Sequence, residues 1–279
     1  MIRSILEQFL VTLELEKYSC RDELPVHNLL GRLKPGAVYL VAGRPGVGKT
    51  AYLANACRTF WNQGHPALII LCGGQTGGPL CQGFGIRLLA METGIPIREL
   101  LDVLQGRIEV DDGYDVRKFY ALEGMMEGAG VQVVGSRSIK GIIKEIENWG
   151  KHAGGGVILL DDLYFGSDSA EIKDINSRFS EILNAIQAVK APCIMTHMLD
   201  RTYEKERRYG PKPAHLKRMK SSTALAFEAI MYLEQYGQNV DKLIVNVQDG
   251  NSTQLIAFLH KFDQETHKIT IDKEEASVN

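Results

Sequence analysis

The feature that most constrains this sequence is a glycine-rich run, Gly43-Arg44-Pro45-Gly46-Val47-Gly48-Lys49-Thr50. It satisfies the pattern G-x-x-x-x-G-K-[ST] of a phosphate-binding loop. Its glycines let the backbone turn tightly and bring N–H groups onto phosphate oxygens with no Cβ in the way. A helix that follows adds a favourable dipole for an anion. We therefore expect ATP here, with Lys49 on the β- and γ-phosphates and Thr50 as a ligand of Mg²⁺.

The residues on either side of this loop predict the strand and the helix that such a site needs. Ala37 to Ala42 is a buried strand by its length and its Val and Tyr content, and Thr50 to Trp61 has the pattern of a helix. His65-Pro66 ends that helix before a second apolar strand, Ala67 to Cys72. Strand, loop, helix and strand in this order begin a parallel sheet covered by helices.

The alternation of helices and strands continues along the chain. The expected helices are Leu80 to Glu92, one that begins near Ile97, Ile139 to Trp149, and Ile172 to Val189. The expected strands are Val131 to Val134, Val157 to Leu160, Cys193 to Met195, Ala229 to Leu233, and Leu243 to Val247. Gln254 to Phe262 should pair with the last of these across the turn Asp249-Gly250-Asn251. The expected fold class is α/β, a mainly parallel sheet flanked by helices, with a C-terminal β-hairpin.

Two acidic residues follow the expected strand Val157 to Leu160. A carboxylate directly after an apolar strand is typical of a Walker B site, which binds the metal from the side opposite the loop. Because ligands bind beyond the carboxyl ends of parallel strands, Asp161 is expected to hold Mg²⁺ together with Thr50. The role of Asp162 stays open between a catalytic group and a polar residue at the end of the strand.

Composition narrows the class of protein. The chain is 44% hydrophobic and 24% charged, which is ordinary for a soluble globular protein. Its net charge of −2 gives no chain-wide basic field, so any polyanion site must be local. Its five cysteines form no CxxC pair and indicate a reducing compartment. Met1 to Lys17 carries three Glu and is no signal peptide, and no apolar run approaches the roughly 20 residues of a membrane span. We expect a cytoplasmic protein without membrane contact.

Four segments in order resemble the carboxy-terminal, RecA-like ATPase domain of DnaB-type replicative helicases. The resemblance extends from about Leu24 to Phe262. The four segments are Leu33-Lys34-Pro35-Gly36 leading into the loop with its Arg-Pro, Ile158-Leu159-Leu160-Asp161-Asp162-Leu163, Ala191 to Arg201, and Val245 to Gly250 with Ala257-Phe258-Leu259. In the third segment, His197 stands where the family has a phosphate-sensing Gln.

The resemblance implies a RecA-like P-loop NTPase fold in residues 24–279 that binds ATP. It also implies a ring of subunits, six in this family, with ATP between neighbours and single-stranded DNA in the pore, and partner proteins of DNA replication. Residues 1–23 are expected to form an amphipathic helix and linker, which packs on its own domain or on a neighbouring subunit. These residues are too few for the family's amino-terminal collar domain.

Two departures from the family affect hydrolysis. The position of the family's catalytic Glu falls on Gly74 or Gln75, and neither can accept a proton as a carboxylate does. Gln75 could instead orient the attacking water, or Asp162 could be the base. The basic pair that reaches a neighbour's γ-phosphate is replaced by Asn246 and Gln248. A missing arginine finger lowers the rate by about 10³-fold or more.

A basic segment, Arg201 to Lys220, contains eight Lys or Arg and two Glu. Tyr203 and Tyr209 lie within it, and Gly210-Pro211 and Pro213 make it a loop. Such a loop can neutralise a nucleic-acid backbone while a ring stacks on a base, although a solvated surface loop has the same composition. The candidate DNA-binding residues are Arg201, Lys205, Arg207, Arg208, Lys212 and Lys217. Arg207, Arg208 or Lys212 could also replace the missing finger.

Three functions are compatible with these features. The first is a ring-forming, DnaB-like ATPase that acts on single-stranded DNA as a helicase or translocase. The second is a nucleotide-switched protein, impaired in hydrolysis, that binds DNA or a helicase and regulates it. The third is an NTPase of a transport or defence system that shares only the fold. For the first, the expected catalytic residues are Lys49, Asp162, Gln75 and His197.

Overall fold

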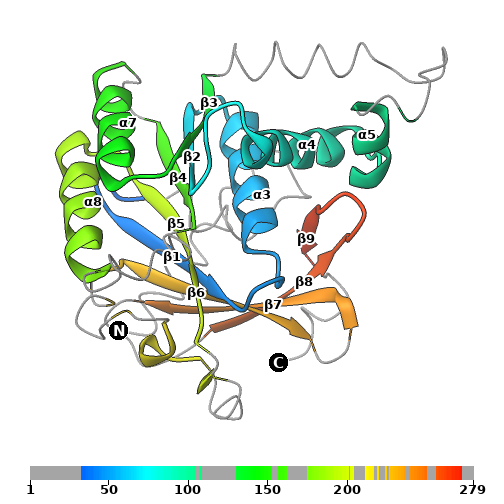
Figure 1. The fold of residues 1–279 in the computed structure, drawn as a ribbon. Coiled ribbons are helices and arrows are strands. Elements are labelled where there is room, and N and C mark those ends of the chain that lie inside the picture. The colour runs from blue at the N-terminus through cyan, green and yellow to red at the C-terminus, as the bar shows by residue number, and fades with distance from the viewer. Residues whose placement is uncertain are drawn as a thin grey trace.

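Short apolar runs rich in Val, Ile and Leu form the strands of one nine-stranded sheet, in the order β3-β2-β4-β5-β1-β6-β7-β8-β9 (Figure 1). The computed structural model describes residues 33–104, 107, 130–152, 156–162, 175–200, 202–203, 211–216, 219, 224, 226–236, 239–249 and 256–271. The strands are β1 Val38–Gly43, β2 Ala67–Cys72, β3 Val131–Ser136, β4 Val157–Asp161, β5 Cys193–Met198, β6 Ala229–Tyr236, β7 Asn239–Asp249, β8 Ile256–Phe262 and β9 Ile269–Ile271. Strands β1 to β6 are parallel, and β7, β8 and β9 are antiparallel.

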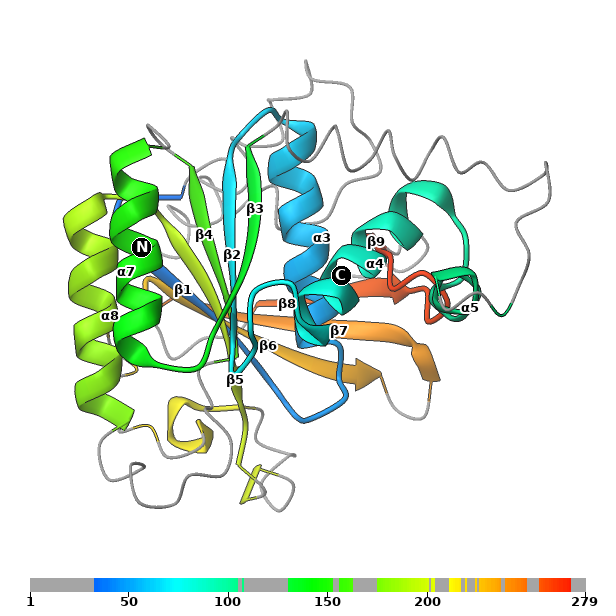
Figure 2. The ribbon, with the colours of Figure 1, turned by 45° about the horizontal axis from the view of Figure 1, so that its top comes forward.

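Helices cover both faces of the parallel part of the sheet (Figures 1 and 2). The helices are α3 Lys49–Asn62, α4 Pro79–Thr93, α5 Ile97–Leu104, α7 Ile139–His152 and α8 Ile175–Val189, with a 3-10 turn, η4, at Pro213–His215. Side chains alternate along each strand, so β1 contributes to two buried clusters. Tyr39 and Val41 face α3 and α4, whereas Leu40 and Ala42 face α7 and α8. None of the described helices is long and apolar enough to cross a membrane.

The predicted α/β architecture is confirmed, with differences in detail. The helix expected from Thr50 begins at Lys49, and the hairpin expected between Leu243 and Phe262 is formed by β7 and β8. Strand β7 is longer than predicted, because its register with β6 continues back to Asn239. Strand β9 was not predicted. The expected helix within residues 1–23 lies outside the described residues.

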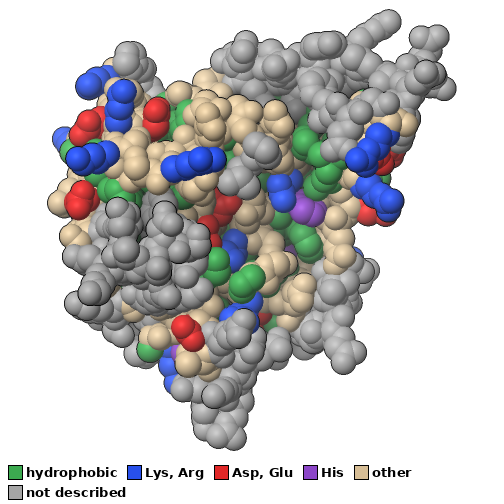
Figure 3. All heavy atoms as spheres, in the orientation of Figure 1, with side chains coloured by type: hydrophobic (Ala, Val, Ile, Leu, Met, Phe, Trp, Pro, Cys, Tyr) green, Lys and Arg blue, Asp and Glu red, His purple; other side chains and the backbone are tan. Residues whose placement is uncertain are grey.

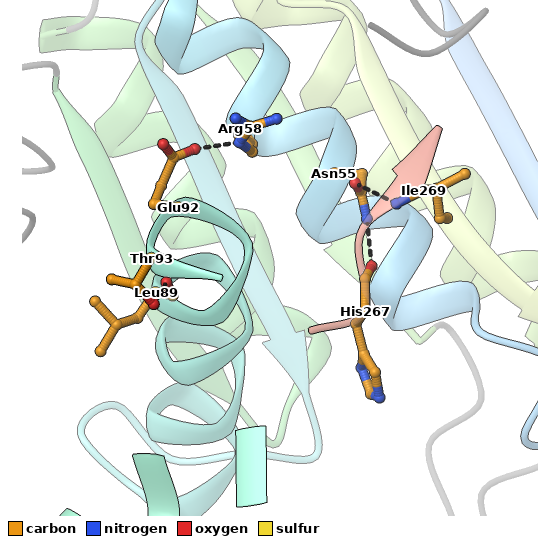
Figure 4. A network of polar contacts seen from close by, with 7 residues as sticks. All are labelled: Asn55, Arg58, Leu89, Glu92, Thr93, His267 and Ile269. Atoms are coloured by element: carbon orange, nitrogen blue, oxygen red, sulfur yellow. Dashed lines mark hydrogen bonds and ion pairs between the residues drawn. The ribbon is translucent and has the colours of Figure 1, made fainter. Parts of the chain in front are cut away.

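A buried amide joins β9 to the helix that follows the loop (Figure 4). Asn55 of α3 is 3% exposed, and its Nδ2 donates to the His267 carbonyl oxygen at 2.8 Å. Its Oδ1 accepts the Ile269 backbone N–H at 3.0 Å. Nearby, Arg58 of α3 forms an ion pair with Glu92 of α4. The end of the antiparallel part of the sheet is thereby attached to α3.

Replacing Asn55 with Ala is expected to lower the free energy of unfolding by about 2–4 kcal/mol. The substitution leaves a buried N–H and a buried C=O without partners, and each such group costs about 1–3 kcal/mol. Urea denaturation followed by circular dichroism measures the change, and Asn62→Ala, at the exposed end of the same helix, is the control. Equal stability of both variants would contradict this role of Asn55.

Candidate functional site

The glycine-rich loop connects the carboxyl end of β1 with the amino end of α3. A Cβ on Gly43 would lie 2.6 Å from Cγ1 of Val47, so the loop can close on itself only with glycine at this position. Gly48, directly before α3, has a φ of 102°, in the left-handed region that glycine adopts without strain. The first helical bond follows at once, since Tyr52 N–H donates to the Gly48 carbonyl at 2.8 Å. The backbone N–H groups at this helix end face an anion site.

Lys49 lies inside the loop, with 9% of its surface exposed. Its Nζ donates to the carbonyl oxygens of Gly43 and Arg44, each at 3.2 Å. Burial lowers the pKa of Lys49, while the negative charges of Asp162 and Asp161 raise it and Arg44 lowers it further. The ammonium group is thus held beside two carboxylates, in a position from which it can turn to a phosphate.

Asp161 ends β4, and two hydroxyl groups from other elements donate to its carboxylate. Thr50 Oγ1, in the first turn of α3, lies 2.7 Å from Asp161 Oδ2. Thr196 Oγ1, in β5, donates to Asp161 Oδ1. The structure therefore places the two expected metal ligands, Thr50 and Asp161, next to each other. A carboxylate and a hydroxyl are hard oxygen ligands of the kind that Mg²⁺ prefers, so this donor set fits the ion.

Strand β5 lies between the loop strand β1 and the strand β4 that carries Asp161. His197 of β5 is fully buried and pairs in register with Ala42, one residue before the loop. Beyond it, Leu199 N–H donates to the Gly43 carbonyl at 3.1 Å, and Arg44 Nη1 donates to the Leu199 carbonyl at 3.5 Å. The expected sensor residue thus lies on a strand that is attached to both ends of the site.

The two candidates for managing the attacking water differ in their surroundings. Burial is the main influence on the pKa of both Lys49 and the Cys72 thiol, and the nearby charge of Asp162 raises the pKa of both groups. Gln75 is exposed, in the turn after β2, and the next residue, Thr76, accepts a bond from Gly135 N–H of β3 at 3.1 Å. That turn is therefore attached to β3, whereas Asp162 lies among the charged groups of the site.

The side chains that replace the family's basic pair are bound within their own sheet. Asn246 Nδ2 donates to Glu234 Oε1 at 3.2 Å, and Tyr232 OH donates to Gln248 Oε1 at 3.2 Å. These bonds join β6 and β7 on one face of the sheet. Neither amide carries the positive charge of an arginine finger.

Three residues that the motifs do not mark lie at the border of the loop. Cζ of Phe262 lies 3.8 Å from the position that a Cβ would take on Gly48, and its ring is 5.6 Å from that of His267. Burial lowers the pKa of Arg87 of α4, and the charge of Asp161 raises it. The buried Arg87 Nε has no hydrogen-bond partner among the described residues. Charged and histidine side chains gather over the region of α3 and β9 in the space-filling view (Figure 3).

The candidate DNA-binding segment is described only in part. Arg201, Lys205, Arg207, Arg208 and Lys217 lie outside the described residues, and Lys212 is exposed. Next to Lys212 the chain is attached to the end of β5. His215 is 4% exposed, its Nδ1 accepts Lys212 N–H at 3.1 Å, and its carbonyl accepts Asp200 N–H at 2.7 Å.

These features define a class of fold, a RecA-like ATPase domain of the kind found in DnaB-like helicases. One similar solved structure is the isolated ATPase domain of such a protein, with a TM-score of 0.71 and 15% identity over 95% of this chain and 97% of that chain. Another is a DnaB-like replicative helicase studied for its interactions with primase, with a TM-score of 0.69 and 14% identity over 85% of this chain and 57% of that chain. No protein-family model matches the sequence, and no curated protein does. The resemblance inferred from the four segments is confirmed at the level of the fold.

Proposed function

We propose that this chain binds ATP with Mg²⁺ and hydrolyses it as a DnaB-like ATPase that acts on single-stranded DNA. The observation that carries the proposal is the convergence of Lys49, Thr50 and Asp161 at the carboxyl ends of β1 and β4. In a parallel sheet, ligands bind at this edge. Because Lys49 bonds only to carbonyls of its own loop, it can turn to a phosphate without rearrangement of the strands.

Each residue of the site has a role in this proposal. The loop amides and Lys49 bind the phosphates, and Thr50 and Asp161 hold Mg²⁺, which when bound neutralises charge on the phosphate oxygens. Asp162 accepts the proton of the attacking water, because its carboxylate lies near Lys49 whereas Gln75 is exposed on the turn attached to β3. His197 senses the γ-phosphate from β5.

Single-stranded DNA is the proposed track, and a ring of like subunits is the proposed assembly. Support comes from the fold, shared over 95% of the chain with the first of the two solved structures, and from the net charge of the segment Arg201 to Lys220. Fluorescence anisotropy of a labelled oligonucleotide tests the track. Binding that requires ATP and weakens steeply with salt is expected. Absence of binding at low salt, with and without ATP, would contradict the proposal.

A second candidate function is a nucleotide-dependent switch that regulates a helicase or DNA and turns ATP over poorly. Two observations favour it: Gly74 has no carboxylate, and Asn246 and Gln248 are bound within their own sheet. Mass photometry with ATP, ADP and no nucleotide separates the two functions. Oligomers that form with ATP and persist for hours without phosphate release would favour the switch over the motor.

A further inference from the structure

Among the described residues, Thr196 is the one besides Thr50 whose side-chain hydrogen bond to Asp161 the structure shows. It lies on β5, one residue before His197, and has no exposed surface. The register of the strands explains its position, because Leu160 of β4 pairs with Met195 of β5, so the next residues, Asp161 and Thr196, are adjacent. Because β5 lies between β1 and β4, its side chain at this level stands between the loop and Asp161.

The hydrogen bonds at Asp161 divide its two carboxylate oxygens between two elements. Oδ1 accepts from Thr196 and Oδ2 accepts from Thr50 at 2.7 Å. A carboxylate with a bond to one oxygen can still rotate, whereas bonds to both oxygens fix its plane. Thr50 is itself an expected ligand of Mg²⁺, so Thr196 is the partner that stays on the carboxylate when Thr50 turns to the ion.

We propose that Thr196 is a positioning residue for the metal, which fixes Asp161 so that Oδ2 points to Mg²⁺ beside Thr50. The inference rests on the proposed function of the site. Groups that bond to a metal ligand from behind set its orientation, and their removal typically lowers metal affinity by about 10–100-fold. Thr196 also connects Asp161 to the strand of His197, so the metal and the sensor position share one rigid strand.

The test is the Mg²⁺ dependence of nucleotide binding, measured by titrating Mg²⁺ against the full chain with a fluorescent ATP analogue. Thr196→Val keeps the shape and removes the hydroxyl, and it is expected to raise the Mg²⁺ midpoint by about tenfold or more. Thr196→Ser keeps the hydroxyl and is expected to restore the midpoint to within about threefold of the natural chain. Thr59→Val, a buried threonine near the other end of α3 that is 5% exposed, is the matched control.

A purely structural role gives a different result. In that case Thr196→Val lowers the melting temperature and leaves the Mg²⁺ midpoint unchanged, and the inference is overturned. If the valine variant does not fold, Thr196→Ala and Thr196→Ser form the same comparison. A natural chain that binds the analogue equally with Mg²⁺ and with EDTA would remove the metal role of Thr196 while leaving nucleotide binding intact. No binding under any condition would overturn the proposed function and this inference together.

Discussion

Lys49→Met is expected to weaken ATP binding by about 100-fold or more. Its Nζ now bonds to two loop carbonyls, at 3.2 Å each, and would transfer those bonds to phosphate oxygens. Hydrogen bonds to charged groups are worth about 1.5–3 kcal/mol each, and about 1.4 kcal/mol is a tenfold change in affinity. Isothermal titration calorimetry with ATP and Mg²⁺ measures the loss.

The fold should survive this substitution. Because burial lowers the pKa of Lys49, its charge is less favourable in the folded chain than in the unfolded one, and this cost is present at pH 7, below both pKa values. Methionine has a similar shape without the charge, so the melting temperature should stay the same or rise. Lys144→Met, at an exposed position on α7, is the control for affinity. Unchanged ATP affinity of the Lys49 variant would show that the loop does not hold phosphate.

Asp162→Asn is expected to lower the rate of ATP hydrolysis by about 100-fold or more while ATP still binds. General-base catalysis contributes about 10²–10⁴-fold, and an amide cannot accept the proton. Single-turnover measurements with protein in excess detect rates this low, and calorimetry on the same sample shows that ATP affinity is kept.

Gln75→Ala is the matched variant, because Gln75 is the alternative residue for managing the water. Its exposed position on the turn attached to β3 predicts a loss of less than about tenfold. The reverse ranking, with a large loss for Gln75→Ala and a small one for Asp162→Asn, would assign the water to Gln75. Equal small losses would mean that neither residue is the base.

Much of the fold could be predicted from the sequence, because its parallel strands are buried on both faces and appear as short apolar runs. Ala67 to Cys72 was expected and observed with the same bounds. The order of the strands could not be predicted, since β1 pairs with β5 and β6, which are far from it in the chain. Strand β9 has only three residues and is stabilised by Asn55 of a distant helix, so no local pattern indicates it.

The candidate site divides in the same way. Lys49, Thr50 and Asp161 were found because each stands at a fixed position in a motif or directly after a strand. Thr196 and Arg87 carry no such mark. Thr196 reaches Asp161 only because β5 is inserted between β1 and β4, and Arg87 comes from α4. A polar residue at the end of β5 could have been noticed from its register with β4, had the strand order been known.

The rate of ATP hydrolysis with and without single-stranded DNA tests the central claim most directly. The natural chain and Lys49→Met are compared by phosphate release at matched protein and Mg²⁺ concentrations. The proposed motor predicts slow hydrolysis by the natural chain that single-stranded DNA accelerates, and none by the Lys49 variant. ATP binding without any DNA-stimulated hydrolysis would contradict the motor and leave bound ATP as a signal.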